Sequence, residues 1–122
     1  MRRNTHTHAR LYLNDHDVGL VEVKGWDDAW GFGEFAAGEA FNRYARYFGD
    51  WSRLLHADRD DDRLTDADKA ALRKVEYEID RLHARLFHLE SQEWRRVSEL
   101  NIDGPLVEWR EGYSVEGEPR AA

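Results

Sequence analysis

The sequence predicts a two-layer α+β fold, in which an antiparallel sheet packs against a long antiparallel helical hairpin. Three observations support this prediction: apolar and polar residues alternate near the N-terminus, apolar residues recur at helical spacing in the middle, and alternation returns near the C-terminus. A chain of 122 residues has room for one domain. We therefore expect a flexible tail over residues 1–9, a single α+β domain over 10–116 and a frayed end over 117–122.

Residues 10–35 predict a three-stranded antiparallel meander. Leu11 and Leu13 lie on one face of the first strand, and a similar alternation continues in the second. Two runs of turn-forming residues, 14–17 and 27–28, separate the three strands. The third strand places aromatic and acidic side chains on one face and two glycines on the other: Trp30, Phe32 and Glu34 against Gly31 and Gly33.

Apolar residues at steps of three and four predict two antiparallel helices after residue 38. The first helix carries an apolar stripe of about four turns: Phe41, Tyr44, Phe48, Trp51 and Leu55. Thr65 and Asp68 resemble a capping box at the start of the second helix, which we expect to run from Asp66 to Val97. Its evidence is a heptad run of six apolar residues: Leu72, Val75, Ile79, Leu82, Leu86 and Leu89. Such a helix would be roughly 45 Å long.

The C-terminal half of this long helix carries a second apolar stripe beside the first. Its members also recur at heptad positions: Tyr77, Ala84, Phe87, Ser91 and Trp94. A helix that is apolar on two sides must be covered twice, so we expect the shorter helix on one side. The sheet or a second copy of the chain should cover the other. After a turn over 101–105, the alternation over 106–109 predicts a last strand that rejoins the sheet.

The composition excludes several classes of function. Without cysteine there is no disulfide scaffold, thiol nucleophile or thiolate metal site. A net charge of −7 without an obvious basic surface argues against direct nucleic-acid binding, although an acidic mimic of nucleic acid that blocks a DNA-binding partner is a third hypothesis. We expect no membrane association and a cytoplasmic location, because residues 1–10 lack a secretory-signal pattern and no apolar run is long enough to span a bilayer. Arg outnumbers Lys by 15 to 3, which indicates a GC-rich bacterial genome.

The acidic segment between the predicted helices resembles a calcium-binding loop in composition only. Asp58, Asp60 and Asp62 match the first three ligand positions of an EF-hand loop. However, Arg63 stands at the glycine position and Lys69 at the final glutamate position. A shifted frame fails as well, because it puts Ala57 and Arg59 at ligand positions. We therefore expect a solvated loop between two helices.

The N-terminal histidines are the second candidate metal site. His6 and His8 share a face if the segment is extended, and His16 approaches them if the chain folds back as a hairpin. Three imidazoles can hold Zn²⁺. The polar surroundings of His6 and His8 favour a mobile tail instead, so we expect no metal.

No group of residues forms a recognisable catalytic constellation. The serines lie in no nucleophile elbow, and Gly31-Phe32-Gly33 is too short for a phosphate-binding loop. His83, beside the heptad seam, is best interpreted as a structural hydrogen-bonding residue. We expect no catalytic residue and no cofactor.

The segment 25–35 is the best candidate for an interaction surface, because four aromatic residues and three glycines occur within eleven positions. Aromatic side chains anchor protein interfaces, although they also fill small cores. With two aromatic residues of the long helix, the candidate surface comprises Trp26, Trp30, Phe32, Phe35, Phe87 and Trp94. We therefore expect a small non-catalytic protein-interaction module, an adaptor or accessory subunit of a larger bacterial assembly, that binds another protein, itself as a homodimer, or both. The alternative is a metal-dependent enzyme or metal sensor that uses the N-terminal histidines or the acidic loop.

Overall fold

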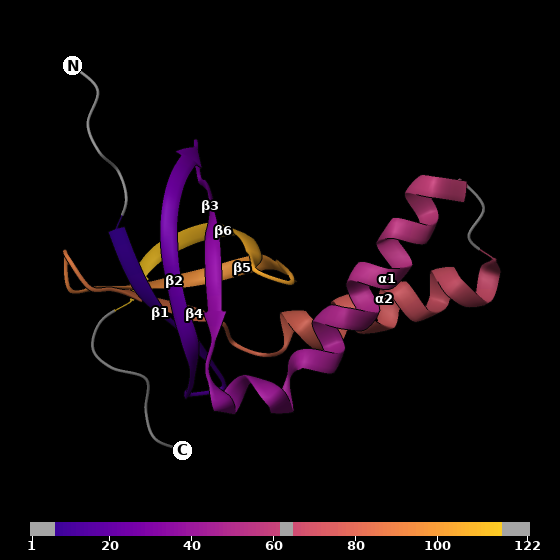
Figure 1. Ribbon diagram of the computed structural model, residues 1–122, viewed down its shortest axis with the longest axis horizontal. Helices are drawn as coiled ribbons and strands as arrows, with labels where there is room; N and C mark the ends of the chain where they lie inside the picture. Colours follow the sequence, from indigo (N-terminus) through magenta and orange to yellow (C-terminus); the bar gives the residue numbers. More distant parts are fainter. Residues whose placement is uncertain (1–6, 62–64, 116–122) are drawn as a thin grey trace.

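The computed structural model describes residues 7–61 and 65–115, and these form a closed antiparallel β-barrel from which two helices project (Figure 1). The elements follow in the order β1 (Thr7–Leu13), β2 (His16–Asp27), β3 (Trp30–Ala37), a 3₁₀ turn (Glu39–Arg43), α1 (Ala45–Asp61), α2 (Asp66–Asp80), β4 (Arg85–His88), β5 (Glu93–Asp103) and β6 (Leu106–Val115). Around the barrel the strand order is β1-β2-β3-β6-β5-β4, and β4 pairs with β1 to close it. The predicted two-layer α+β architecture is therefore wrong.

The first three strands lie where the alternation of the sequence placed them. β1 pairs with β2 and β2 with β3, both antiparallel. The turns between them contain Asn14, Asp15 and Asp28 with positive φ of 49°, 70° and 59°. Asn and Asp adopt this left-handed region more readily than other residues with a side chain, so the local sequence specifies both hairpins. This meander forms half of the barrel wall.

The two helices are shorter than the predicted helical hairpin and project from one end of the barrel (Figure 1). α2 begins as the sequence indicates, because the Thr65 hydroxyl accepts a hydrogen bond of 3.0 Å from the backbone N–H of Asp68. It ends at Asp80, where the prediction extended it to Val97. No helix in the described parts of the chain is both long and apolar enough to cross a membrane.

Residues 85–103 form the β4–β5 hairpin, and residues 81–84 link it to α2, which corrects the long-helix prediction. A spacing of four, as between Leu82 and Leu86, places two residues on one face of a helix and also on one face of a strand. Leu82 and Ala84 of the link and Leu86 of β4 are all buried, at a spacing of two residues. The second predicted stripe is divided between two strands, because Phe87 of β4 stands opposite Trp94 of β5. Pairing of β4 with β1 removes an open sheet edge, and a helix here would leave that edge exposed.

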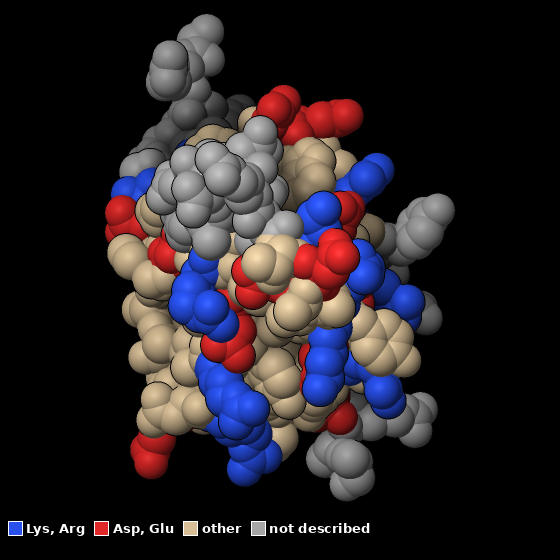
Figure 2. Space-filling model, turned by 90° about the vertical axis from the view of Figure 1, so that its right-hand side faces the viewer, with Lys and Arg blue, Asp and Glu red and all other residues tan. Residues whose placement is uncertain are grey.

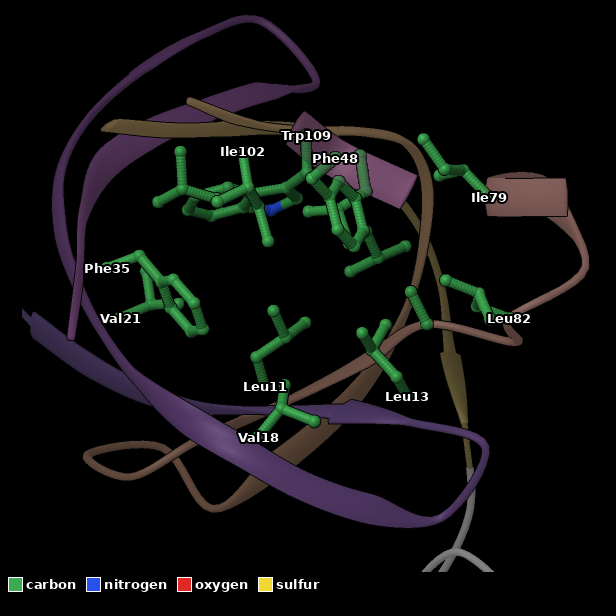
Figure 3. Close-up of a cluster of buried hydrophobic side chains, with 14 of the residues drawn as sticks. Leu11, Leu13, Val18, Val21, Phe35, Phe48, Ile79, Leu82, Ile102 and Trp109 are labelled. Atoms are coloured by element: carbon green, nitrogen blue, oxygen red, sulfur yellow. The ribbon is translucent and has the colours of Figure 1, made fainter. Parts of the chain in front are cut away.

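The hydrophobic core fills the barrel interior and extends to the base of the helices (Figure 3). Leu11, Val21 and Phe35 point inward from the meander, and Trp109 of β6 is 1 % exposed. Space for this indole comes from β3, because an added Cβ at Gly31 would lie 2.5 Å from Trp109 Cζ2. The inward face of β3 is therefore glycine-rich where β6 carries its largest side chain.

Candidate functional site

The aromatic segment that the sequence singled out is divided between the inside and the outside of the barrel. Phe35 is 6 % exposed and belongs to the core, whereas Phe32, three residues earlier on β3, is 45 % exposed. Trp26 is 43 % exposed and Trp30 is half-buried. Of these four residues, Trp26 and Phe32 present the largest apolar surface to a partner.

Phe87 and Trp94 lie elsewhere, on the outer face of the β4–β5 hairpin. Their ring centroids are 4.8 Å apart, and the Tyr12 ring of β1 lies 5.0 Å from Trp94. Trp94 is buried by these contacts within one chain. Since β6 separates β5 from β3, the structure does not join this pair to Phe32 in one surface.

The predicted histidine cluster is not assembled by the described residues. His8 pairs with Glu22 in the β1–β2 ladder, whereas His16 stands opposite Leu13 at the other end of the hairpin. His16 Nδ1 contacts the Tyr44 hydroxyl at 2.6 Å instead. No three potential metal ligands gather anywhere in residues 7–61 and 65–115. His6 and Asp62 lie outside the described residues, as do the side chains of Asp58 and Asp60.

An apolar cavity of about 380 Å³ lies beside α1 on the outside of the barrel, and we call it the α1 groove. Five apolar side chains line it: Phe32 of β3, Trp51 and Leu55 of α1, and Leu106 and Val107 at the start of β6. Leu106 is 61 % exposed and Phe32 45 %. The Phe32 ring lies over Gly25 of β2, where an added Cβ would come within 2.6 Å of it. Trp51 donates its Nε1–H to Glu76 of α2 at 3.3 Å, which links the groove wall to the second helix.

The rim of the α1 groove is acidic. Asp103 and Glu108 line it, and Glu108 accepts a hydrogen bond of 3.2 Å from the Asn101 amide. Among the residues that the structure describes, no Lys or Arg lines the groove. On the face shown in Figure 2, by contrast, Lys and Arg mix with Asp and Glu over tan surface, so neither sign dominates there. The groove thus combines exposed apolar surface with local negative charge.

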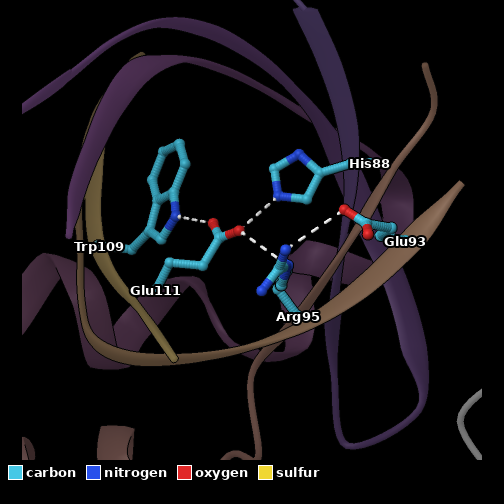
Figure 4. A network of polar contacts seen from close by, with 5 residues as sticks. All are labelled: His88, Glu93, Arg95, Trp109 and Glu111. Carbon is cyan, nitrogen blue, oxygen red and sulfur yellow. Dashed lines mark hydrogen bonds and ion pairs between the residues drawn. The ribbon is translucent and has the colours of Figure 1, made fainter. Parts of the chain in front are cut away.

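A polar network connects side chains of β4, β5 and β6 (Figure 4). Glu111 of β6 accepts the indole N–H of Trp109 at 2.9 Å, and its other oxygen lies 2.9 Å from His88 Nε2 on β4. Arg95 of β5 approaches the same carboxylate at 3.8 Å. The His88 and Glu111 side chains are only 12 % and 13 % exposed. Both carboxylate oxygens are engaged, so the network satisfies the charge of a largely buried carboxylate.

Sequence reasoning missed this network and most of the groove. Glu111 follows Val107 and Trp109 at steps of two, so a carboxylate on the apolar face of the predicted last strand was a usable signal. Trp51 and Leu55 were recognised, but as the buried stripe of a helix. Only the closed barrel places Leu106 beside them.

Comparisons with family models, with curated proteins and with solved structures found no match to this chain.

Proposed function

We propose that the chain is a small non-catalytic protein-interaction module, an adaptor or accessory subunit, that holds a protein partner in the α1 groove. The observation that carries this proposal is the exposed pair Phe32 and Leu106 beside an open apolar cavity. The barrel has its own core, so these two side chains add little to the interior. Contiguous apolar surface of this kind on a folded protein is typical of a binding site. The cysteine-free composition favours action in the cytoplasm.

The charge of the rim narrows the chemistry of the partner. A segment with one large apolar side chain flanked by Lys or Arg complements a groove lined by Asp103 and Glu108. The net charge of −7 would also speed encounter with a basic partner at low salt. A symmetric dimer through the same groove would bring two acidic rims together, so we favour a different protein over a second copy.

Site-specific photo-crosslinking in the cells that express the protein tests this proposal. A photoreactive phenylalanine analogue replaces Leu106 in one sample and Tyr77 of α2 in the control. The two positions are matched, because each side chain is 61 % exposed. We expect a discrete heavier adduct from position 106 that is missing from position 77, and mass spectrometry then identifies the partner.

Binding to the identified partner provides the second measurement. Phe32→Ser and Leu106→Ser should each weaken it at least tenfold, the size expected for a residue at the centre of an interface. Higher salt should weaken it further if the acidic rim contributes. Identical adducts from both positions, or an adduct only with a second copy of the chain, would contradict the proposal.

A further inference from the structure

A second cavity, of about 660 Å³, lies where α2 ends and the β4–β5 hairpin begins, and we call it the α2–β5 pocket. Its apolar lining comes from α2, β5 and the α2–β4 link: Ile79, Ala84, Val97 and Leu100, each at most 8 % exposed. The turn between β1 and β2 supplies another wall through Asn14 and Asp15. A volume of this size suits a small organic molecule.

The backbone around this pocket is unusually strained. Asn14, Asp15, His83 and Glu99 all line it and all have positive φ, between 49° and 70°. Asn and Asp tolerate that region well, but His83 and Glu99 do so at a cost. The β5 ladder also shifts register on both sides of Val97 and Ser98. Bulges and left-handed residues tend to cluster where a fold shapes a binding site.

Two arginines and three carboxylates line the pocket, and the two arginines face each other across the β4–β5 ladder. Arg85 of β4 and Arg96 of β5 are directly opposite each other, and like charges in that position are destabilising. Asp15 forms an ion pair with Arg85. Arg85 Nε is buried and has no acceptor among the described residues, and Arg96 has no ion-pair partner within the same part of the chain. Of these two opposed arginines, only Arg85 therefore has a carboxylate partner among the described residues.

The negative groups of the pocket limit how much anionic charge a ligand can bring. Glu99 forms an ion pair with Arg110 at 3.7 Å, and Arg110 is not one of the two pocket arginines. Asp80, at the end of α2, lines the same cavity. A doubly charged anion would meet repulsion from Asp80, whereas a single carboxylate can pair with Arg96 in the planar geometry that guanidinium favours.

We propose that the α2–β5 pocket binds a small monocarboxylate with an apolar body. The carboxylate pairs with Arg96, and the hydrocarbon lies on the buried side chains of Ile79, Ala84, Val97 and Leu100. This site shares no lining residue with the α1 groove. Its test is therefore independent of the proposed protein partner.

Titration of ¹⁵N-labelled protein with hexanoate tests this site by nuclear magnetic resonance. We expect saturable shifts of the Arg96, Val97 and Ser98 amide signals. Butanoate, two methylenes shorter, should bind roughly tenfold more weakly because less apolar surface is buried. Arg96→Gln should weaken hexanoate binding at least tenfold, whereas Arg73→Gln on the exposed face of α2 should leave it unchanged.

Several results would overturn the proposal. One is the absence of saturable shifts up to roughly 10 mM hexanoate, where a millimolar complex would be largely formed. Equal binding of hexylamine, or tighter binding of inorganic phosphate than of hexanoate, would exclude the carboxylate class. Unchanged affinity in Arg96→Gln, with a well-dispersed spectrum that shows the variant folded, would remove Arg96 from the site.

Discussion

At the residue scale, two glycines of β3 leave room for atoms of the neighbouring strands β2 and β6. An added Cβ at Gly33 would lie 1.9 Å from the Glu22 carbonyl oxygen, which is backbone and cannot rotate away. At Gly31 the obstacle is the Trp109 indole. A methyl group at position 33 would therefore force the β2–β3 ladder apart.

Gly33→Ala should consequently destabilise the protein by about 3 kcal/mol, the upper end of the range for overpacking a well-packed site. Gly49→Ala is the matched control, because nothing lies within 4 Å of the added Cβ on α1. There the loss of glycine should stabilise the helix by roughly 0.5–1 kcal/mol. Urea denaturation of both variants measures the two effects, and equal stability of the two would contradict the close contact at Gly33.

Leu82→Ala tests the core at the junction between α2 and β4. Leu82 is 6 % exposed, and its carbonyl accepts a hydrogen bond of 2.8 Å from the Asn14 N–H. Removal of this buried side chain should destabilise the protein by about 2–5 kcal/mol. A loss below about 1 kcal/mol in chemical denaturation would mean that the junction collapses around the missing atoms or is not packed in solution.

At the element scale, the β4–β5 turn is tied to β1 by a charged contact. The His8 backbone N–H donates to Glu90 at 2.9 Å, and this bond lowers the pKa of the Glu90 carboxyl. A carboxyl whose pKa is lowered on folding stabilises the fold above its unfolded pKa and loses that contribution as the pH falls through the folded value.

Glu90→Gln should therefore differ most from the wild type near neutral pH. The difference in melting temperature should shrink as the pH falls below about 4.3, the ordinary pKa of glutamate. Thermal denaturation between neutral and acidic pH measures it. A difference that stays constant over that range would show that the Glu90 charge does not contribute to stability through the contact with His8.

The start of α2 illustrates what local sequence specifies within an element. The Thr65 hydroxyl accepts a hydrogen bond from the backbone N–H of Asp68, one of the first-turn N–H groups that have no partner within the helix. Thr65→Ala should cost about 1 kcal/mol, whereas Thr65→Ser retains the acceptor and should cost little. If both variants lose the same stability in urea denaturation, the cap is not the source of the effect.

The end of α2 shows the limit of the same local reasoning. Ile79, Leu82 and Leu86 continue the heptad pattern, and no glycine or proline interrupts the segment before Gly104. Nothing local therefore indicates that the helix ends at Asp80. The deciding interaction is the pairing of β4 with β1, more than seventy residues away in the chain.

At the scale of the whole molecule, the Phe87–Trp94 pair tests whether the barrel is complete as a single chain. Trp94 is buried by Phe87 and Tyr12 of the same chain, so we expect a monomeric mass by light scattering. Phe87→Asp combined with Trp94→Asp should unfold the protein, because it places two charges in that contact. A wild-type dimer that becomes a folded monomer in the double variant would instead assign these rings to an interface between copies.

The candidate groove shows how far sequence reasoning reached toward function. Phe32 was selected from its aromatic and glycine-rich surroundings, and it is exposed. Trp51 and Leu55 were placed on the correct helix, and Leu106 at the start of the correct strand. Their proximity could not be predicted, because β6 lies beside β3 only after the chain has passed through both helices and two further strands.

The sequence by itself determined the elements whose cause is local: the meander with its Asn-Asp and Asp turns, the Thr65 cap and the last strand. In each case residues within a few positions of one another supply the periodicity or the hydrogen bond. Only the tertiary structure decided that the segment after Asp80 forms the β4–β5 hairpin and that the sheet closes. A spacing of four residues fits either period, so burial against β1 selected the strand, and the same closure brought Glu111, His88 and Trp109 together inside the barrel.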